Sequence, residues 1–461
     1  MKQLPYAAEN VGGKPMKKFF VLFLAVMLLV SATVCFAQEP ANMEELKALD
    51  ASLTEDIVIE IWGKDGTSKE TSRGTIFTNF ANEYSALFDH VTVTYIHQGG
   101  YDDVRTKVMA ASVAGELPGI WMAEESTVKS FAAIAADLNE CVPEATVKDY
   151  LPGLLSSSLY DGDRLIGAPA ARSNPVMFVN NEVLAAAGWT GDQIKTTDDL
   201  FKCAKDIYEK TGKPGLAAWW DTDLWHWESE IYADGGQVLT DDGSKPAFGK
   251  DYDYVGAKYA LRIQEGLKEG YVVSYYSDPK PYDSVTLNLT TGELGIALIS
   301  SNSMKSRYNA AAENGYTLSV YVQPAGDAGV PSVTGGGSCW VLADSMSDTE
   351  KAFAGGWLSY IASVDKVVER TKITGDMMVT QSALDSEGGK ALIEEVPGLQ
   401  AIYDSVPYLH ARPNTPYWAE MYNYGADKLA QFCLNYETTD VYAMIDEMEL
   451  KFQQIIDDNA W

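Results

Sequence analysis

The sequence predicts an α/β protein built from two lobes that the chain crosses more than once. Apolar strands alternate with amphipathic helices from Asp56 onward, which is typical of parallel sheets with helical crossovers. A buried strand pauses at a polar bend over residues 172–175 and resumes at Val176, as expected where a chain leaves one lobe for another. The 461 residues also exceed what one hydrophobic core usually serves.

The first 37 residues are expected to form a signal peptide. Two lysines precede an uncharged apolar run over residues 19–30, and small residues lead to Ala37, which fits cleavage there. An uncleaved membrane anchor is the alternative, since the run reaches the lower limit for spanning. Cys35 raises lipid attachment as a third option, against which stands Val34, where Gly, Ala or Ser normally precedes a lipidated cysteine. In each case the mature protein lies outside the cytoplasmic membrane.

Charge and cysteine content restrict the partners and the chemistry. The formal net charge of −30 repels nucleic acid and anionic membrane surfaces, so nucleic-acid binding is excluded, while 46% hydrophobic residues indicate a folded protein. Four cysteines follow the signal segment, without a CxxC pair. Three disulfide pairings are open, and isolated buried thiols are the other interpretation. These cysteines are Cys141, Cys203, Cys339 and Cys433.

The first part of the mature chain is expected to alternate between strands and helices. The strands are expected at residues 56–62, 91–97 and 117–122, and the helices at residues 75–88, 101–114 and from Ser126 onward. In such sheets the ligand site forms at the carboxyl ends of the strands, where the loops gather.

The polar bend divides the next pair of strands, at residues 165–169 and 176–179. Pro175 disfavours helix at Asn174, and a helix led by an asparagine N-cap then runs to Gly188. Later helices are expected at residues 198–210, 253–269, 350–363, 417–435 and 441–456, and later strands at residues 292–300 and 333–342.

Two more crossings between the lobes are expected, near residues 299–303 and 335–340. The N-terminal lobe is therefore predicted to hold residues 38–170 and 300–338. The C-terminal lobe is predicted to hold residues 171–299 and 339–461.

The chain lacks the motifs of common enzymes and metal sites. It has no GxSxG, no phosphate-binding P-loop and no HExxH, and its four histidines show no metal-ligand spacing. We therefore expect no enzyme, no catalytic residue, no cofactor and no metal. The alternative is a secreted carbohydrate-active enzyme that uses Glu124 or Asp221 as an acid.

The order of short motifs resembles the extracellular solute-binding proteins (family 1) of carbohydrate-type ABC importers, over essentially the whole mature chain. The matching motifs are GGYD at residues 99–102, GELPGIWM at 115–122, YDGDRLIGAP at 160–169, VNNEVLAAAG at 179–188 and GGGSCWVL at 335–342. The resemblance implies the periplasmic-binding-protein fold, in which two interleaved lobes joined by hinge crossings close over a ligand. It also implies a monomer that delivers its ligand to ABC permease subunits in the membrane.

Tryptophans supply the candidate walls of a sugar site, because indole faces stack on sugar rings. Four of them cluster at Trp219, Trp220, Trp225 and Trp227. They cannot all face one cleft, so we expect Trp225 or Trp227 to line it and the others to pack in a core.

Polar candidates follow the expected strands and crossings. Hydroxyls, a carboxylate and exposed amides suit a polyol, and guanidinium groups suit an anion. Packing, turn formation and surface salt bridges are the competing interpretations. With the tryptophan of the GGGSCW motif, these candidates are Tyr101, Glu124, Arg172, Ser173, Ser301, Ser303, Gly336, Gly337, Trp340 and Arg412.

Within the resemblance, several of these positions look most like the glycerol-3-phosphate-binding branch. One departure matters, because that branch has a tyrosine where this chain has Asp376. An acid beside a phosphate is unfavourable. A carbohydrate or sugar-like polyol, safest as a neutral sugar, is therefore the expected ligand class. Glycerol 3-phosphate or its diesters remain the alternative.

Overall fold

The computed structural model describes residues 42–160, 162–218, 224–413 and 415–459. The predicted signal peptide, with Cys35 and Ala37, lies outside these residues, as do Trp219, Trp220 and Asp221. In the described part of the chain, no helix combines the length and the apolar character needed to cross a membrane.

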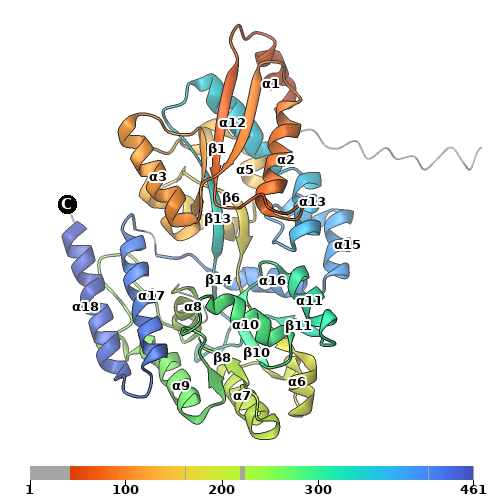
Figure 1. Ribbon diagram of the computed structural model, residues 1–461. Coiled ribbons are helices and arrows are strands. Elements are labelled where there is room, and N and C mark those ends of the chain that lie inside the picture. The colour runs from red at the N-terminus through yellow and green to blue at the C-terminus, as the bar shows by residue number, and fades with distance from the viewer. Residues whose placement is uncertain (1–41, 161, 219–223, 414, 460–461) are drawn as a thin grey trace, which may run out of the picture. The chain divides into compact units, whose positions relative to one another are not determined.

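A mixed five-stranded sheet with the order β2-β1-β3-β13-β6 forms the first half of the fold (Figure 1). β1 is parallel to β2 and β3, whereas β13 is antiparallel to β3 and β6. The strands are β1 (Ile57–Gly63), β2 (Val91–His97), β3 (Ile120–Glu124), β6 (Ala168–Ser173) and β13 (Gly336–Leu342). The helices around it are α1 (Met43–Asp50), α2 (Arg73–Ser85), α3 (Tyr101–Ala114) and α12 (Asp348–Ile361).

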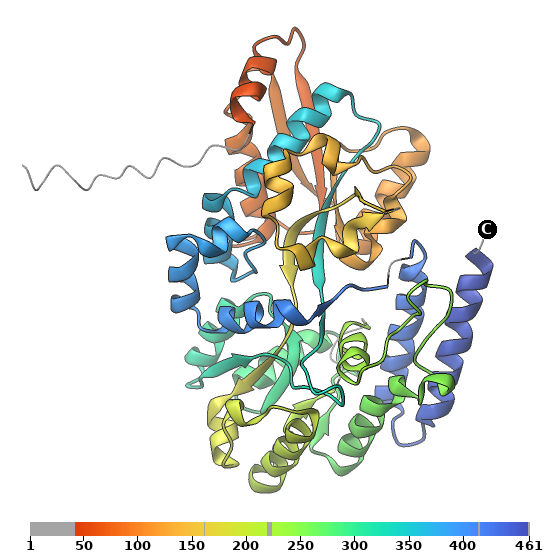
Figure 2. The same ribbon diagram turned by 180° about the vertical axis from the view of Figure 1, so that it is seen from behind.

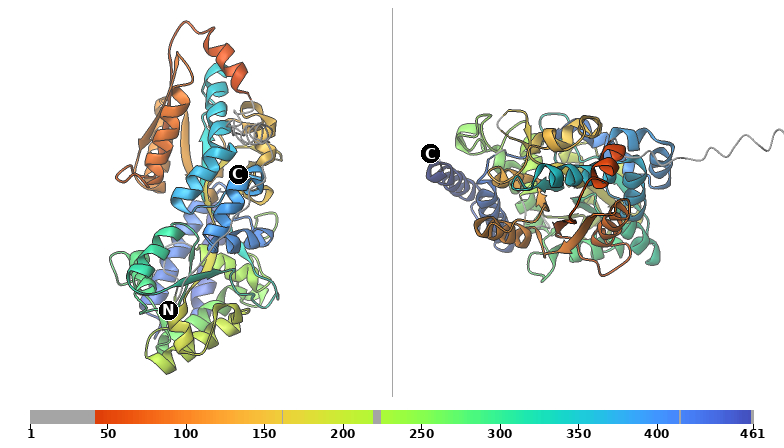
Figure 3. Two further views of the ribbon diagram at one scale, coloured as in Figure 1. Left: turned by 90° about the vertical axis from the view of Figure 1, so that its right-hand side faces the viewer. Right: turned by 90° about the horizontal axis from the view of Figure 1, so that it is seen from above.

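Both faces of this sheet are covered, which explains its nearly continuous apolar strands. In β3, Ile120 and Met122 join one hydrophobic core, while Trp121 and Ala123 join another on the opposite face. The first core holds the buried side chains of α2 and α12, which run along the sheet in Figure 3. The second core lies under α3 and the 3₁₀ helix η1 (Glu125–Phe131).

A second five-stranded sheet has the order β11-β7-β10-β8-β9. Its inner strands β7 and β10 are buried at every position, and the central β10 is antiparallel to β7 but parallel to β8. The strands are β7 (Pro175–Asn180), β8 (Leu216–Ala217), β9 (Val272–Val273), β10 (Ile296–Ser300) and β11 (Leu318–Tyr321). The helices of this half are α6 (Asn181–Ala186), α7 (Thr197–Thr211), α8 (Trp225–Ala233), α9 (Val255–Glu269), α10 (Pro281–Thr290) and α11 (Met304–Glu313).

The chain passes between the two sheets at Asn174, the single residue between β6 and β7. Its backbone N–H donates to Ser301 Oγ at 3.3 Å, and Ser301 N–H donates to its carbonyl at 3.0 Å. The expected polar bend is therefore shorter than predicted, since both strands run up to Asn174. Two other segments of the chain, β12 (Val333–Thr334) and β14 (Leu409–His410), pair with each other in parallel orientation.

The remaining helices complete the two halves. α17 and α18 pack against each other, and α18 packs against α9 (Figures 1 and 2). These helices are α4 (Leu138–Cys141), α5 (Glu144–Asp149), α13 (Val364–Thr374), α14 (Gln381–Asp385), α15 (Glu387–Glu395), α16 (Gly398–Ser405), α17 (Trp418–Leu434) and α18 (Val441–Asn459). The short strands β4 (Leu159–Tyr160) and β5 (Arg164–Leu165) pair with each other in antiparallel orientation. The short 3₁₀ helices are η2 (Pro152–Leu154), η3 (Ser156–Ser158), η4 (Gly191–Gln193), η5 (Lys250–Tyr252) and η6 (Val406–Tyr408).

The two-sheet α/β architecture confirms the predicted fold class. The element after Ser126 is a 3₁₀ helix rather than an α-helix. The N-terminal lobe was predicted to hold residues 300–338, but β11, within that range, belongs to the second sheet. The predicted lobe boundary between residues 338 and 339 falls inside β13, all of which belongs to the first sheet. The assignment of residues to lobes stays a prediction. The four cysteines are free thiols, of which three are buried.

Candidate functional site

A cavity of about 330 Å³ lies where several strands of both sheets end. Four lining residues follow or close the carboxyl ends of β1, β3, β6 and β10, which is the usual place for a ligand in such sheets. Its volume falls near the lower end of the range of about 300–1,000 Å³ for small-molecule sites. The lining residues are Lys64, Tyr101, Glu124, Ser173, Trp225, Tyr282, Ser300, Asn302, Gly336, Gly337, Arg412 and Tyr422.

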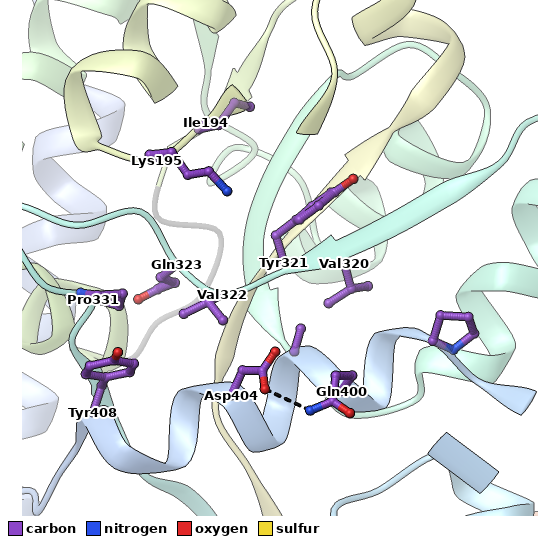
Figure 4. Close-up of a pocket in the computed structure, with 12 residues that line it drawn as sticks. Ile194, Lys195, Val320, Tyr321, Val322, Gln323, Pro331, Gln400, Asp404 and Tyr408 are labelled. Carbon is purple, nitrogen blue, oxygen red and sulfur yellow. Dashed lines mark hydrogen bonds between the residues drawn. The ribbon is translucent and has the colours of Figure 1, made fainter. Parts of the chain in front are cut away.

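This cavity brings together seven of the twelve ligand-binding residues expected from the sequence. They are Tyr101, Glu124, Ser173, Trp225, Gly336, Gly337 and Arg412. A second cavity of about 520 Å³ lies between the end of β11 and α16, beside Lys195, Tyr321 and Tyr408 (Figure 4). It is lined by none of the twelve, so the smaller cavity is the candidate site.

Arg412 stands at the centre of a buried charge network. Its guanidinium meets Glu228 with two hydrogen bonds, Nε to Oε2 at 3.0 Å and Nη2 to Oε1 at 2.5 Å. A third hydrogen bond joins Nη1 to Glu124 Oε1 at 3.2 Å. Burial raises the pKa of Glu228, and the charge of Arg412 opposes that shift. The guanidinium is thus engaged by two carboxylates, which compete with any anionic ligand group for its N–H donors.

Glu124 places an acceptor at the end of β3. Its Oε2 accepts hydrogen bonds from the backbone N–H and the hydroxyl of Ser126, which fix the carboxylate at the start of η1. Tyr101 at the start of α3 shares a 2.7 Å hydrogen bond between its hydroxyl and Ser338 Oγ. A fixed carboxylate can accept from hydroxyl groups, so this side of the cavity suits a polyol.

Trp225 and Trp227 separate as the sequence required, because residues two apart on a helix face different sides. Trp225 lines the cavity, and its Nε1 donates to the carbonyls of Thr334 at 2.8 Å and Gly335 at 3.1 Å. Trp227 lies in the core of the second sheet, where its Nε1 donates to Gly256 O at 2.9 Å. Trp225 is therefore the aromatic wall, and Trp227 is not a cavity residue.

The glycines of β13 let the backbone approach its neighbours closely. A Cβ on Gly336 would lie 2.6 Å from the Trp225 ring. Gly337 has φ +102°, and a Cβ there would lie 2.2 Å from the carbonyl oxygen of Ala171. β13 pairs with Ser173 and Arg172 at these two glycines, next to a shift in register. Only glycine suits position 337 without a backbone shift.

The structure corrects the expectation that Arg172 is a cation of the cleft. Its side chain is fully buried, forms an ion pair with Glu125 and donates to Cys339 Sγ at 3.3 Å. The physical reason is strand alternation: neighbouring residues of β6 point to opposite faces, and Ser173 is the one that faces the cavity.

Three other expected residues also lie away from the cavity. Trp340 is a core residue in edge-to-face contact with Phe77 and Trp357. Ser301 is buried and fixes the crossing at Asn174. Ser303 is exposed and starts α11 in a left-handed conformation, with φ +59°.

Five lining residues were missed by the sequence argument: Lys64, Tyr282, Ser300, Asn302 and Tyr422. Ser300 and Asn302 flank the expected Ser301 and Ser303, so the segment was found but not the side chains that face the cavity. Lys64 directly follows β1, and the carboxyl-end rule could have found it. Tyr282 and Tyr422 lie on helices and carry no local signal.

Asp376 does not line the cavity, although the negative charge of an aspartate at this position was the reason to doubt a phosphate site. It is buried and receives two hydrogen bonds from Arg73, at 2.5 Å and 2.6 Å. Burial opposes its ionisation, but the charge of Arg73 prevails and lowers its pKa. In the described ranges, no group of three His, Cys, Asp or Glu residues is arranged to hold a metal ion.

Comparison with known proteins gives a consistent set of relatives. The sequence model described as "Bacterial extracellular solute-binding protein" matches residues 79–397. The sn-glycerol-3-phosphate-binding periplasmic protein UgpB of Yersinia enterocolitica is 21% identical over 352 residues, which cover 72% of this chain and 77% of that protein.

Solved structures share the fold. A cyclic alpha-maltosyl-1,6-maltose binding protein from Arthrobacter globiformis superposes with a TM-score of 0.74 at 22% identity, over 88% of this chain and 100% of that one. UgpB from Mycobacterium tuberculosis, in complex with glycerophosphocholine, superposes with a TM-score of 0.74 at 17% identity, with the same coverage of both chains.

Proposed function

Because this chain belongs to the bacterial extracellular solute-binding proteins, we propose that it captures a carbohydrate or sugar-like polyol for an ABC importer. The ligand binds in the cavity between the two sheets, and the protein delivers it to permease subunits in the membrane. Membership of a solute-binding family gives a binding role without chemistry. The ligand favours the closed arrangement of the lobes and so shifts the hinge equilibrium.

The observation that carries the proposal is the pairing of an aromatic wall with a fixed acceptor. Trp225 offers an indole face to the apolar side of a sugar ring. Glu124, held by Ser126, accepts from ring hydroxyls on the other side. Ser173 and the hydroxyl of Tyr282 line the same cavity and add short polar contacts. Such a lining suits a compact polyol.

Glycerol 3-phosphate and its diesters are the second candidate. The relatives named for these ligands favour them, since they cover most of this chain. The carboxylates around Arg412 weigh against a phosphate at that residue, because Glu124 and Glu228 already engage its guanidinium. The two candidate ligands therefore differ at Arg412: a glycerol phosphate would place its phosphate there, whereas a neutral carbohydrate would place no charge there.

A thermal-shift screen tests the proposal with neutral mono- and disaccharides, glycerol 3-phosphate and glycerophosphocholine. A ligand present at 100 times its Kd stabilises the folded state by about 2.7 kcal/mol, so a specific ligand is visible. A shift with at least one carbohydrate supports the proposal. Shifts confined to glycerol phosphates replace it with the second candidate. Release of product from a glycan contradicts a binding role.

Export completes the proposal. We propose cleavage near Ala37, with lipid attachment at Cys35 as the alternative, and a monomer as the working form. Intact mass of the protein purified from its secreting host separates these outcomes, because an acylated cysteine adds the mass of its lipid.

A further inference from the structure

The second sheet ends in an open edge at β11. This strand pairs with β7 on one side, and no other described strand continues the sheet beyond it. The edge segment, LSVYVQ over residues 318–323, has no charged residue and no proline. Proteins usually protect such an edge with lysine, proline, a bulge or a covering segment, because its free backbone groups recruit other strands. The edge of β11 therefore has the character of a binding surface.

The hydrogen-bond register shows which backbone groups of β11 face outward. Asn181 N–H donates to Thr317 O at 3.0 Å, just beyond the last pair of the ladder between β7 and β11. Hydrogen-bonded positions alternate along an antiparallel strand, so the odd-numbered residues of β11 bond to β7 and the even-numbered residues do not. Val320, and Val322 directly after the strand, therefore direct their N–H and C=O groups away from β7. In the described ranges, no other backbone group hydrogen-bonds to either residue.

The cavity of about 520 Å³ lies along this edge. Val320, Tyr321 and Val322 all line it, although neighbouring side chains of a strand point to opposite faces. In Figure 4, Tyr321 points up from the strand, whereas Val320 and Val322 point toward α16. A space bordered by residues of both faces lies beside the edge of the strand, where the free backbone groups are.

The lining of this cavity is mostly apolar and carries balanced charges. α16 packs against β11 and supplies Asp404, while Lys195 lies just ahead of α7. These two charged lining residues have opposite signs, so the cavity as a whole favours an uncharged occupant. The apolar lining residues are Ile194, Val320, Val322, Pro331, Pro397 and Ala401.

Gln323 adds a buried polar group that lacks a partner. It lines the cavity and is 2% exposed, yet its Nε2 has no hydrogen-bond partner in the described part of the chain. Buried amides are almost always hydrogen-bonded in folded proteins, because leaving a hydrogen bond unmade is costly. A side-chain amide both donates and accepts, so its chemistry matches that of a peptide group. An occupant of the cavity could thus satisfy side-chain as well as backbone groups.

We propose that the edge of β11 is a docking site for a short, extended, uncharged peptide that adds one strand to the second sheet. The backbone groups of Val320 and Val322 pair with the peptide backbone, and Gln323 bonds to a further peptide group. The apolar lining receives the side chains of the peptide. This cavity shares no lining residue with the candidate carbohydrate site, so the inference does not depend on the proposed function.

Ala325 sets the length of the occupant. Its N–H donates to Lys195 O at 2.9 Å, and Thr197 N–H donates to its carbonyl at 2.9 Å, so the open edge ends before it. The six residues of the open stretch span about 20 Å, at about 3.3 Å per residue. A second copy of the chain would bring its own α16 against this edge, whereas a peptide has nothing beside it. A single peptide strand is therefore the occupant that fits.

Calorimetry with capped tetrapeptides tests the proposal on the mature protein. The probes are acetyl-Val-Thr-Val-Thr-amide, acetyl-Ile-Ser-Ile-Ser-amide and acetyl-Ala-Gln-Ala-Gln-amide, which are all uncharged. At least one is expected to bind with a dissociation constant of about 1 mM or below. The absence of binding by all three would overturn the proposal.

N-methylation of the binding peptide, one residue at a time, tests strand addition itself. The N–H groups of alternate residues hydrogen-bond to β11, so methylation at these two positions is expected to weaken binding about tenfold. Methylation at the other two positions is expected to keep the affinity within about threefold, because their N–H groups face away from β11. Equal effects at all four positions would show that the peptide does not pair with the strand, and would also overturn the proposal.

Two matched variants locate the peptide. Gln400 and Gln381 are exposed glutamines that each donate, at 2.8 Å, to an aspartate four residues later. Gln400→Trp places a ring in the cavity and is expected to weaken peptide binding about tenfold, with thermal melts as the check on folding. Gln381→Trp, outside the cavity lining, is expected to keep the parent affinity. If both variants bind as the parent does, the peptide site lies elsewhere and the proposal fails.

Sedimentation of the free protein distinguishes a peptide from a second copy. A monomer is expected at the concentrations used for calorimetry. A dimer that Gln400→Trp dissociates would mean that another copy of the chain occupies the edge, and would replace the peptide as the occupant.

Discussion

Arg412 and Glu228 form a bidentate ion pair whose side chains are both almost fully buried, 184 positions apart in the sequence. Arg412→Ala would leave the Glu228 carboxylate, which has no exposed side-chain surface, without its main partner. We expect a loss of about 3–5 kcal/mol in the free energy of unfolding, measured by urea denaturation. The double variant Arg412→Ala/Glu228→Gln is expected to recover much of that loss.

The exposed pair of Lys205 and Glu269 provides the comparison for this prediction. Its atoms lie 2.6 Å apart, but both side chains are more than 40% exposed. Lys205→Ala should cost less than about 1 kcal/mol. Equal costs at Arg412 and Lys205 would show that burial does not control the strength of the first pair.

Trp225 and Trp227 allow ligand contact and core packing to be tested with the same substitution. Trp225→Leu removes the aromatic wall and is expected to weaken carbohydrate binding by about tenfold, as expected for a lost stacking contact. Trp227→Leu removes a core ring and is expected to lower the melting temperature with affinity kept within about threefold. Calorimetry and thermal melts on both variants check this. A larger loss of affinity at Trp227 would reverse the assignment of the wall.

Gly337 is expected to tolerate no side chain. Gly337→Ala places a Cβ against the carbonyl oxygen of Ala171 in addition to the strain of φ +102°. Gly115→Ala introduces comparable strain, at φ +75°, with no atom within 4 Å of the added Cβ. Gly115→Ala should therefore cost about 1–2 kcal/mol and Gly337→Ala clearly more, in urea denaturation. Equal losses would mean that the close approach of β13 to β6 carries no energy of its own.

Glu230 is expected to make stability fall as the pH rises. Burial, and secondarily Asp234, raises its pKa from 4.5 to about 8, while Arg262 opposes the shift. Between these values the folded state holds a proton that the unfolded state has released, so the free energy of unfolding decreases with pH. The slope reaches about 1.4 kcal/mol per pH unit.

Glu230→Gln removes that ionisation. The variant is expected to gain stability over the parent progressively from about pH 4.5 to about pH 8, with a constant difference above, in denaturation curves taken across this range. Glu313→Gln, at an exposed residue of α11, is the control and should follow the parent curve. A difference that does not change with pH would mean that Glu230 is ionised in the folded state.

The sequence carried the parts of the site that obey local rules. Tyr101, Glu124 and Ser173 were found because the carboxyl ends of strands and the starts of helices collect ligand residues. Gly336 and Gly337 were chosen because their exposed amides would suit the oxygens of a polyol. Arg172 was wrongly predicted to face the cleft. Neighbouring residues of a strand point to opposite faces, so Arg172 and Ser173 could not both line the cavity, and it is Ser173 that does.

The remaining parts depend on contacts that no local pattern encodes. Glu228 is internal to a helix of aromatic residues, and nothing near it in the sequence points to Arg412. Arg307 is an ordinary basic residue of α11 until Tyr282 and the end of β10 are brought against it. The single residue Asn174 between β6 and β7 likewise emerges only from pairing between the strands on either side.

The position of β13 bears on how the chain reaches its native state. This strand lies between β3 and β6 in the first sheet, yet it begins at Gly336, more than 200 residues after β3 begins at Ile120. A ribosome would therefore release most of the first sheet long before its missing strand. Until then β3 and β6 have unpaired edges, and closing so long a loop is slow. The first sheet is therefore expected to stay incomplete until the chain has been synthesised as far as Leu342, the last residue of β13.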